Sequence, residues 1–337
     1  MPTETVYGLG ANALDEAACK SIFTTKGRPL TDPLIVHVHS VEQALGLADS
    51  SATEVMQIFK ILAAKFWPGP LTLVVRANLE QVPMMITAET GFVGLRMPSS
   101  ELALALLKES GVPIAAPSAN KFGHVSPTKA EHVYNDFYLD SEVTILDGGP
   151  CNFGIESTVM KICDLGDKKF EFLVLRKGGV SEKALHEAIK DVPELHDFDI
   201  SIVAKAHKEF KEETENLEGP GQFLRHYAPN IDSFLFAGEV KDQNIQLSRS
   251  VLIDFGAILA SQKDKVQHYV DLSARGSFLE AVNQLYDVLR WAETREDSDS
   301  VLIADVLKLA QSAEIEGAEH KEALFDRIFR ATSGKQA

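Results

Sequence analysis

Short apolar runs alternate with helix-like stretches along the first 192 residues of this 337-residue chain. The runs include Leu71–Val75, Val143–Leu146 and Phe172–Leu175, and each is long enough for a strand. Among the helix-like stretches, Thr53–Phe66 has helical periodicity and ends at a Trp-Pro-Gly-Pro sequence, where the prolines stop a helix. This alternation predicts an α/β domain over residues 1–192, built on a twisted mixed sheet.

A second, smaller α/β domain is predicted over residues 231–337. Strand-like runs at Val251–Phe255 and Val301–Val306 lie on either side of an amphipathic helix over Gly276–Glu296, and a last helix spans about Glu319–Ala331. Strand–helix–strand–helix order is typical of a Rossmann-like fold. Because this segment has no G-x-G-x-x-G sequence, we do not expect a nucleotide site in it. Residues 193–230, which include a dense charged run, are predicted to link the two domains.

Cationic side chains stand next to two of the predicted strands in the first domain. Lys26 and Arg28 flank a glycine in an expected loop, directly before an apolar strand that carries His37. Arg96 lies within another apolar strand and must reach solvent or pair with an anion, since burial of an unpaired arginine is very unfavourable. Cations and free backbone N–H groups are what bind phosphate oxygens. The pattern therefore indicates an anion site, although a solvated surface would explain each cation taken singly.

Polar side chains also follow a predicted strand at Val112–Ala116, which comes after a helix predicted over Ser99–Gly111. Ser118 and Asn120 occupy alternate positions past the end of this strand, so their side chains can point the same way. The carboxyl ends of strands are where α/β proteins usually bind ligands. An ordinary turn remains the alternative, because Ser and Asn are common in turns.

The composition limits the classes of partner. A net charge of −16 argues against tight binding of nucleic acid, which normally requires a basic face. Three cysteines without C-x-x-C spacing argue against a zinc site and a disulfide framework, and they favour the reducing cytoplasm. The sequence has neither an apolar run of about 18 residues nor a secretory signal pattern, so we expect no membrane association.

Six motifs occur in the order and spacing of one known family. They are PTETVYGLG at Pro2–Gly10, KGRP at Lys26–Pro29, GLRMP at Gly94–Pro98, APSAN at Ala116–Asn120, STV at Ser157–Val159 and LRKGG at Leu175–Gly179. With these motifs the region Pro2–Val192 resembles the YrdC-like threonylcarbamoyl-AMP synthases. GPGQFLRHYAPN at Gly219–Asn230 is similar to the interdomain linker of the long form of that family, and EALFDRIFRATSG at Glu322–Gly334 is similar to the end of its C-terminal domain.

The resemblance implies an activity and a set of contacts. Threonine, bicarbonate and ATP would give threonylcarbamoyl-AMP, pyrophosphate and water, and a downstream transferase complex would use the product to modify an adenosine of tRNA. A carbamate oxygen attacks the α-phosphorus, so alignment and charge stabilisation suffice and no catalytic nucleophile is expected. The implied ATP contacts are Lys26, Arg28, Asp32, Ser118, Asn120 and Arg176, with Arg225, His226 and Tyr227 in a lid. The implied threonine contacts are Thr5, His37, Arg96, Ala116 and Ser157. Mg²⁺ is expected on the triphosphate, without a metal site built by the protein.

Two features depart from the family pattern. Asp32 stands where the family usually has Asn, and a carboxylate beside phosphates would repel them. Family members also carry a helix and a strand ahead of the PTET motif, whereas here Met1 directly precedes Pro2, so we expect the first domain to lack its N-terminal strand. Two other functions remain open, a non-enzymatic RNA-binding module and a carbamoyl-transfer module like that of hydrogenase-maturation proteins. The latter carry cysteine-rich zinc segments, which this sequence lacks.

Overall fold

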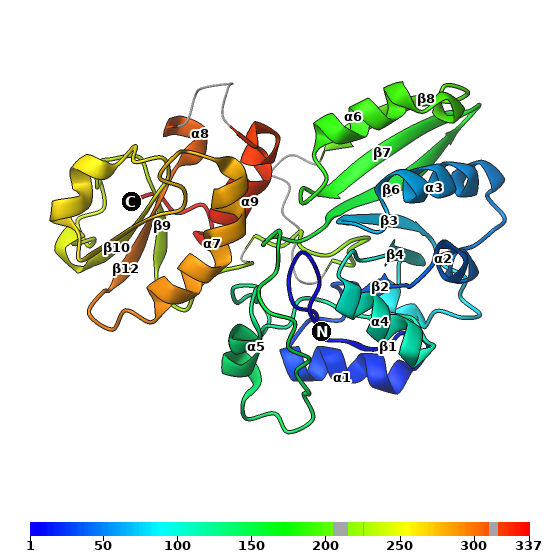
Figure 1. Cartoon of the computed structure of the whole chain (residues 1–337), viewed down its shortest axis with the longest axis horizontal. Coiled ribbons are helices and arrows are strands. Elements are labelled where there is room, and N and C mark those ends of the chain that lie inside the picture. The colour runs from blue at the N-terminus through cyan, green and yellow to red at the C-terminus, as the bar shows by residue number, and fades with distance from the viewer. Residues whose placement is uncertain (205–214, 225, 310–315) are drawn as a thin grey trace.

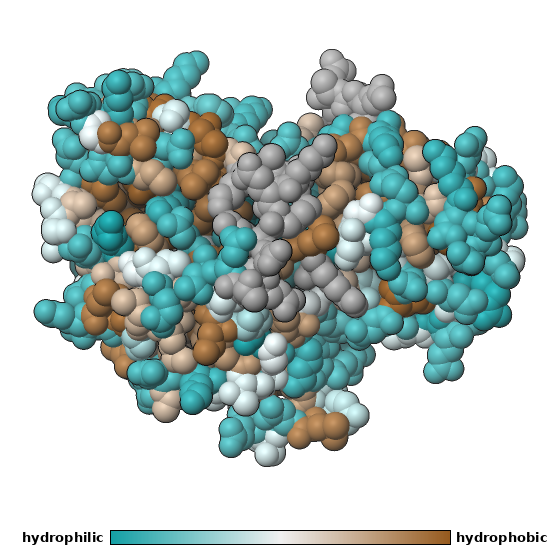
Figure 2. Space-filling model, turned by 180° about the vertical axis from the view of Figure 1, so that it is seen from behind, coloured by the Kyte–Doolittle hydropathy of each residue, from teal (hydrophilic) through white to brown (hydrophobic). Residues whose placement is uncertain are grey.

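The chain forms two α/β domains in a computed structural model that describes residues 1–204, 215–224, 226–309 and 316–337. The first contains an eight-stranded sheet and the second a four-stranded sheet (Figure 1). The predicted fold class is confirmed. Hydrophilic side chains cover most of the face seen in Figure 2, with apolar side chains in smaller groups between them.

The first sheet has the strand order β1-β5-β2-β4-β3-β6-β7-β8. It is mixed, since the β2–β4, β3–β6 and β7–β8 pairs are parallel and the other pairs are antiparallel. The strands are β1 (Ala11–Asn12), β2 (Ile35–His37), β3 (Leu71–Arg76), β4 (Phe92–Arg96), β5 (Ile114–Ala115), β6 (Thr158–Gly166), β7 (Lys169–Arg176) and β8 (Asp199–Ala204). The helices are α1 (Glu16–Lys26), α2 (Val41–Leu47), α3 (Thr53–Phe66), α4 (Glu101–Ser110), α5 (Ala130–Phe137) and α6 (Glu182–Asp191), with 3-10 turns at Met84–Thr87 and Pro193–Leu195.

Helices α3, α4 and α6 begin or end close to where the sequence predicts. Ser100 caps α4 by accepting a hydrogen bond from the Ala103 amide, and Gly111 ends the helix in the left-handed conformation, with φ of 68°. Ser181 likewise caps α6. Helix α3 spans the predicted residues. Side-chain oxygens at these positions satisfy amides that the first turn of a helix leaves free.

The two faces of the sheet differ because side chains alternate along each strand. Leu73 and Leu95 point into the main apolar core, which also contains side chains of α1, α2, α3 and α6. Val74 lies on the opposite face in a small separate cluster. His37 and Arg96 are register partners on the parallel strands β2 and β4, one residue away from core positions. Alternation therefore places both on the face turned away from the main core.

Two predictions about strands are wrong. Val143–Leu146 lies outside any strand, and Val143 and Ile145 pack by their side chains onto a small cluster around Tyr7 and Phe137. The segment is apolar because it covers this cluster. Asp199–Ala204, which we assigned to the linker, instead forms β8 and pairs in parallel with β7. Its polar–apolar alternation is that of a half-exposed edge strand, and this signal was overlooked beside the charged run that follows.

The second sheet is parallel throughout, in the order β11-β10-β12-β9. Its strands are β9 (Ser233–Phe236), β10 (Ser250–Asp254), β11 (His268–Asp271) and β12 (Ser300–Ala304). The helices are α7 (Phe278–Glu293), α8 (Val306–Leu309) and α9 (Lys321–Ala331), and 3-10 turns lie at Leu247–Arg249, Ala260–Lys265 and Ala318–His320. The Rossmann-like expectation is confirmed, although β9 and β11 were missed because both are short. Figure 1 shows α7 and α9 on the side of this sheet that faces the first domain.

None of the helices in the described ranges is long and apolar enough to cross a membrane.

Candidate functional site

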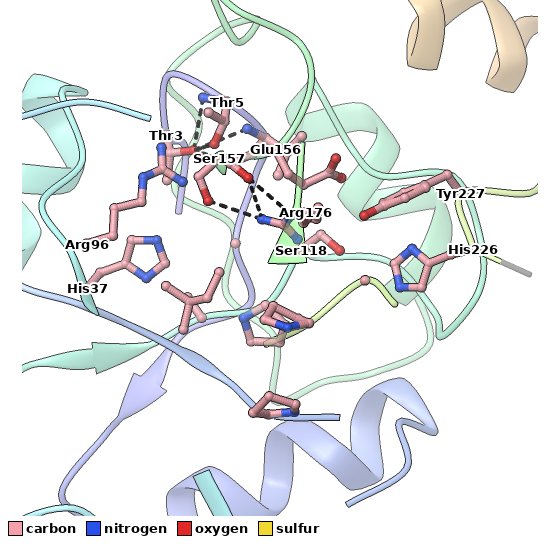
Figure 3. Close-up of a pocket in the computed structure, with 18 of the residues that line it drawn as sticks. Thr3, Thr5, His37, Arg96, Ser118, Glu156, Ser157, Arg176, His226 and Tyr227 are labelled. Atoms are coloured by element: carbon pink, nitrogen blue, oxygen red, sulfur yellow. Dashed lines mark hydrogen bonds between the residues drawn. The ribbon is translucent and has the colours of Figure 1, made fainter. Parts of the chain in front are cut away.

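A cavity that opens to solvent lies on the face of the first sheet that carries His37 and Arg96. Figure 3 shows these two side chains on one side of it and Tyr227 and His226 on the other. Most of the predicted site residues line the cavity, namely Thr5, Arg28, His37, Arg96, Ala116, Ser118, Ser157, Arg176, His226 and Tyr227. Residues far apart in the sequence thus meet in one place. They include both implied ATP contacts and implied threonine contacts.

Arg28 and Arg176 supply positive charge to this cavity, and both are buried. Arg28 donates from Nη2 to the Pro33 carbonyl at 2.7 Å and forms an ion pair with the Asp32 carboxylate at 3.0 Å. Arg176 donates from Nε and Nη2 to the Ser157 carbonyl at 3.1 and 3.0 Å. These contacts hold each guanidinium in one orientation, which suits binding of an anion.

A glycine allows the β7 end to approach Ser157 closely. An added Cβ at Gly178 would lie 2.3 Å from the Glu156 carbonyl oxygen and 2.4 Å from the Ser157 carbonyl carbon. No side chain fits in that space. The glycine in the LRKGG motif therefore has a steric role that keeps Arg176 against Ser157.

Arg96 and His37 line the side of the cavity that lies away from Tyr227 and His226 (Figure 3). Arg96 donates from Nη2 to Glu4 Oε1 at 2.5 Å and from Nε to the Gly69 carbonyl at 3.3 Å. Burial, with Arg96 adding to it, lowers the pKa of His37 to about 3, so this imidazole is neutral at neutral pH. Glu4 was not predicted as a site residue. Its position in the PTET motif, beside Thr3 and Thr5, was the available signal.

Hydroxyl groups line the floor of the cavity. Thr3 Oγ1 lies 2.9 Å from Thr5 Oγ1 and donates to the Val6 carbonyl at 2.6 Å. Ser157 Oγ lies 2.8 Å from the Oγ1 of Thr72, a β3 residue on the same sheet face. Thr3, which lines the cavity, and Thr72, which contacts Ser157 without lining it, were also missed, because a buried threonine is common without any functional role.

Three buried polar atoms at this cavity have no hydrogen-bond partner among the described residues. They are Nδ1 of His37, Nδ1 of His226 and the hydroxyl of Tyr227. Buried polar groups in native proteins nearly always have a partner. A polar ligand in the cavity would supply one, so these atoms mark it as a binding site.

Three predicted ATP contacts do not line the cavity. Lys26 is the last residue of α1 rather than part of a loop, and its ammonium donates to the carbonyls of Ser118 and Asn120. Burial, and Arg28 after it, lowers the pKa of Lys26 well below its usual value. Asp32 is fully buried against Arg28. Asn120 donates to the Lys121 and His124 carbonyls at 2.8 and 2.9 Å. In this structure these residues shape the loops around the cavity.

The segment Gly219–Asn230 crosses from the first domain to the second and contributes His226 and Tyr227 to the cavity. Tyr227 has a left-handed backbone, with φ of 61°, and its ring stacks on Tyr286 of α7 at 5.7 Å between centroids. A tyrosine in this conformation is strained, and such strain is often found at functional sites. Burial, and then Arg28, keeps the pKa of His226 well below its usual value. Arg225, the third predicted lid residue, lies outside the described residues.

Within the described ranges, no group of three or more His, Cys, Asp or Glu side chains could hold a metal ion. The three cysteines, Cys19, Cys151 and Cys163, are all free thiols.

Comparison with known proteins identifies the family. The Sua5/YciO/YrdC family, whose description reads "telomere recombination", matches residues 1–178, and the C-terminal domain of threonylcarbamoyl-AMP synthase matches residues 180–333. The chain belongs to the Sua5/YciO/YrdC family. Its two matching regions correspond to the long form that has the additional C-terminal domain, as the motifs predicted.

Two relatives carry the name threonylcarbamoyl-AMP synthase. The Pyrococcus abyssi protein is 43% identical over 237 residues, which is 70% of this chain and 63% of the relative. The Bacillus subtilis protein is 38% identical over 295 residues, covering 86% of this chain and 79% of the relative. The matched part of this Sua5-family chain thus spans less than two thirds of the archaeal relative.

A solved structure has the same two-domain architecture. The crystal structure of P. abyssi Sua5 complexed with L-threonine matches with a TM-score of 0.77 and 35% identity, over 98% of this chain and 89% of that chain. This degree of similarity covers both domains of the Sua5-family chain, including the segment between them.

Proposed function

We propose that this chain is an L-threonylcarbamoyladenylate synthase that converts threonine, bicarbonate and ATP to threonylcarbamoyl-AMP, pyrophosphate and water. One observation carries the proposal: Arg28, His37, Arg96 and Arg176 all line a single cavity. A threonine carboxylate and a triphosphate both need such cations. The family relationship supports the same reaction, since the P. abyssi and B. subtilis relatives carry this name.

Threonine would bind at the Arg96 side, among Thr5, His37, Ala116 and Ser157. Its carboxylate would accept from the Arg96 guanidinium, which now donates to Glu4. The incoming carboxylate therefore has to share Arg96 with Glu4 or replace it. A neutral His37 suits this side, because a neutral imidazole can accept a hydrogen bond at one ring nitrogen. Its unpartnered Nδ1 is available to the ligand.

ATP would bind at the Arg28 and Arg176 side, with Ser118 nearby. Bicarbonate and the threonine amine combine into a carbamate, whose oxygen attacks the α-phosphorus while pyrophosphate leaves. The chain supplies alignment and positive charge for this step rather than a nucleophile. Mg²⁺ would arrive on the triphosphate and neutralise part of its charge. This fits a cavity whose acidic neighbours Glu4 and Asp32 are already paired with arginines.

Lys26, Asp32 and Asn120 would act on ATP through the loops that they hold, not through the cavity wall. The product is a labile mixed anhydride, and the proposed consumer is a downstream transferase complex that modifies tRNA. The reducing cytoplasm remains the predicted compartment.

Release of pyrophosphate from ATP tests the proposal directly. We expect release that requires both threonine and bicarbonate, with threonylcarbamoyl-AMP detected by mass spectrometry. ATP turnover that is indifferent to threonine would contradict the proposed reaction. RNA binding with a steep salt dependence and no ATP turnover would instead favour the RNA-binding alternative.

We further propose that Gly219–Asn230 closes over the bound substrates and shields the anhydride from water. His226 and Tyr227 line the cavity, and Gly221 in the same segment has φ of 82°, a turn that favours glycine. Limited proteolysis should show slower cleavage near Gly221 when ATP and threonine are both present. Equal rates with and without the substrates would mean that the segment is only a tether.

A further inference from the structure

Glu156 is a buried carboxylate at the cavity wall, directly before Ser157 in the sequence. Its Oε1 accepts from Ser126 Oγ at 2.6 Å. Its Oε2 accepts from two side chains of the second domain, the Tyr286 hydroxyl and Arg327 Nε, each at 2.8 Å. A carboxylate in the first domain is therefore held largely by donors from the second.

Arg327 is fully buried, and it contacts the first domain at other groups besides the Glu156 carboxylate. Its Nη2 donates to the Lys177 carbonyl at 2.8 Å, directly after the cavity residue Arg176. Its guanidinium carbon lies 4.8 Å from the centre of the Tyr227 ring. Nη1 stays within the second domain, paired with Asp326 at 2.7 Å. One side chain of α9 thus contacts the neighbours of Ser157 and Arg176, and Tyr227 itself.

We propose that Arg327 of the second domain is a positioning residue for the synthase site, acting through Glu156 on the Ser157 and Arg176 wall of the cavity. The inference rests on the proposed function. It assigns the second domain a part in the site, although Arg327 does not itself line the cavity. Removing Arg327 would leave a buried carboxylate without its cation, which is strongly unfavourable, and the wall that carries this carboxylate would have to move.

Electrostatics agree with this geometry. Burial would raise the pKa of Glu156, but Arg327, and Arg176 after it, outweigh burial and hold the pKa below its usual value. Glu156 is therefore charged at neutral pH, and Arg327 of the second domain makes the largest of the contributions that lower its pKa.

Arg290 of α7 offers a matched control, since it too is buried and joins the two domains. It pairs from Nη1 with Asp136 of α5 at 2.9 Å and donates from Nη2 to the Val125 carbonyl. Neither Arg290 nor these two partners lines the cavity. Loss of either arginine weakens the domain interface, but of the two only Arg327 contacts the Glu156 carboxylate directly.

The test compares Arg327→Met with Arg290→Met in the full chain, by steady-state pyrophosphate release and by hydrogen exchange without substrates. Arg327→Met should lower kcat/KM for threonine by about ten- to hundredfold, because a shift of the Ser157 and Arg176 wall by about 1 Å misplaces the groups that bind the substrates. In the Arg327→Met variant, the backbone amides of residues 156–158 and 176–179 should exchange hydrogen faster than in the unaltered chain. Arg290→Met should keep its kcat/KM, and its exchange should rise around α5. Equal kinetic losses and equal exchange patterns in the two variants would overturn the proposal.

The double variant Glu156→Gln, Arg327→Met separates positioning from general stability. If Arg327 acts through the Glu156 charge, the double variant should be more active than Arg327→Met alone, because no uncompensated charge remains. If the kcat/KM of the double variant falls by the product of the two single-variant losses, the proposal is overturned.

If Arg327→Met does not fold, Tyr286→Phe offers a second test, because it removes one donor to the same carboxylate and keeps the ring. We expect a smaller fall in kcat/KM, and an unchanged value would overturn the proposal.

The exchange measurement also separates this inference from the proposed function. If the unaltered chain releases no threonine-dependent pyrophosphate, the proposed function fails, while the exchange pattern still decides whether Arg327 holds the Glu156 wall.

Discussion

The cavity of the first domain and the strand ends of the second both contain buried polar groups, yet they differ in how these groups are satisfied. In the second domain, Asp254 accepts from the Phe255 amide at 2.7 Å, the Leu259 amide at 2.9 Å and the Tyr269 hydroxyl at 2.7 Å. In the first domain, His37, His226 and Tyr227 each leave a buried polar atom without a partner among the described residues.

A second acidic side chain at those strand ends is used in the same way. Asp271 accepts from the amides of Gly256, Ala257 and Ser273 at 3.1, 2.7 and 2.9 Å. Carboxylates after parallel strands are often ligand contacts, but here the protein's own loops occupy them. The difference teaches that a polar group at a strand end of an α/β fold is not by itself evidence of a ligand site, because the protein's own loops can satisfy it.

The largest effect on activity is expected at Arg96, and its absence would break this comparison between the two regions. Arg96→Ala removes the cation proposed for the threonine carboxylate, so the KM for threonine should rise about ten- to hundredfold, corresponding to about 1.5–3 kcal/mol. The KM for ATP should change much less. Steady-state kinetics with each substrate varied in turn measures both, and an unchanged threonine KM would remove Arg96 from the site. Arg96→Lys, which keeps the charge but loses the planar fork, should lie between.

A somewhat smaller effect is expected on the opposite wall. Arg28→Ala should raise the KM for ATP about tenfold, since one charge-assisted contact is lost, and should leave the KM for threonine nearly unchanged. Normal ATP kinetics would argue against a phosphate role for Arg28.

Asp32→Asn is the matched control for Arg28. It removes the carboxylate that pairs with Arg28 at 3.0 Å and places there the residue usual in the family. The KM for ATP should fall, because Arg28 loses a competing anion. A rise in the KM would mean that Asp32 is needed to hold Arg28 in place.

The pH dependence of the free energy of unfolding gives a further test of the buried His37 side chain in the first-domain cavity. Burial lowers the pKa of His37 from 6.5 to about 3, so between these values the unfolded chain binds a proton that the folded chain does not. His37 therefore makes stability fall as pH drops from about 6.5 towards 3, by about 1.4 kcal/mol per pH unit within that window. Urea unfolding of His37→Gln should show a shallower decline than the unaltered chain. NMR titration of labelled histidines provides the direct check, and a His37 midpoint above pH 5 would refute the assignment.

The smallest effect on activity is expected in the second domain. Asp254→Asn puts an amide among donors that need an acceptor, so the free energy of unfolding should fall by about 1–3 kcal/mol. The KM values for ATP and threonine should stay as they are, because Asp254 serves only its own loops. A selective change in either KM would break the comparison, since it would make these strand ends part of a site.

Much of the fold could be predicted from local patterns in the sequence. The bounds of α3, the caps of α4 and α6 and the strands around His37 and Arg96 depend on residues close in sequence, which is why they were found. The failures have a different origin. Val143–Leu146 is apolar because of distant packing partners, and β8 is a strand because β7 offers it an edge. Neither cause is visible within a short window.

The site divides in the same way. The resemblance of the motifs to a known family was enough to select Arg28, His37, Arg96, Ser157 and Arg176, and strand periodicity explains why His37 and Arg96 share a face. Whether a selected residue reaches the cavity depends on its neighbours in space. The Lys26 ammonium donates to the carbonyls of Ser118 and Asn120, and Lys26 does not line the cavity.

The sequence by itself determined that this chain forms two α/β domains, since propensity and alternation are local properties, and the resemblance of its motifs to a known family indicated which of them belong to one site. Only the tertiary structure decided that Glu4 meets Arg96 and that Arg327 meets Glu156. Both are pairs of charges far apart in the chain. Buried charges are stable only when they are paired, and the fold alone decides which residues are brought together.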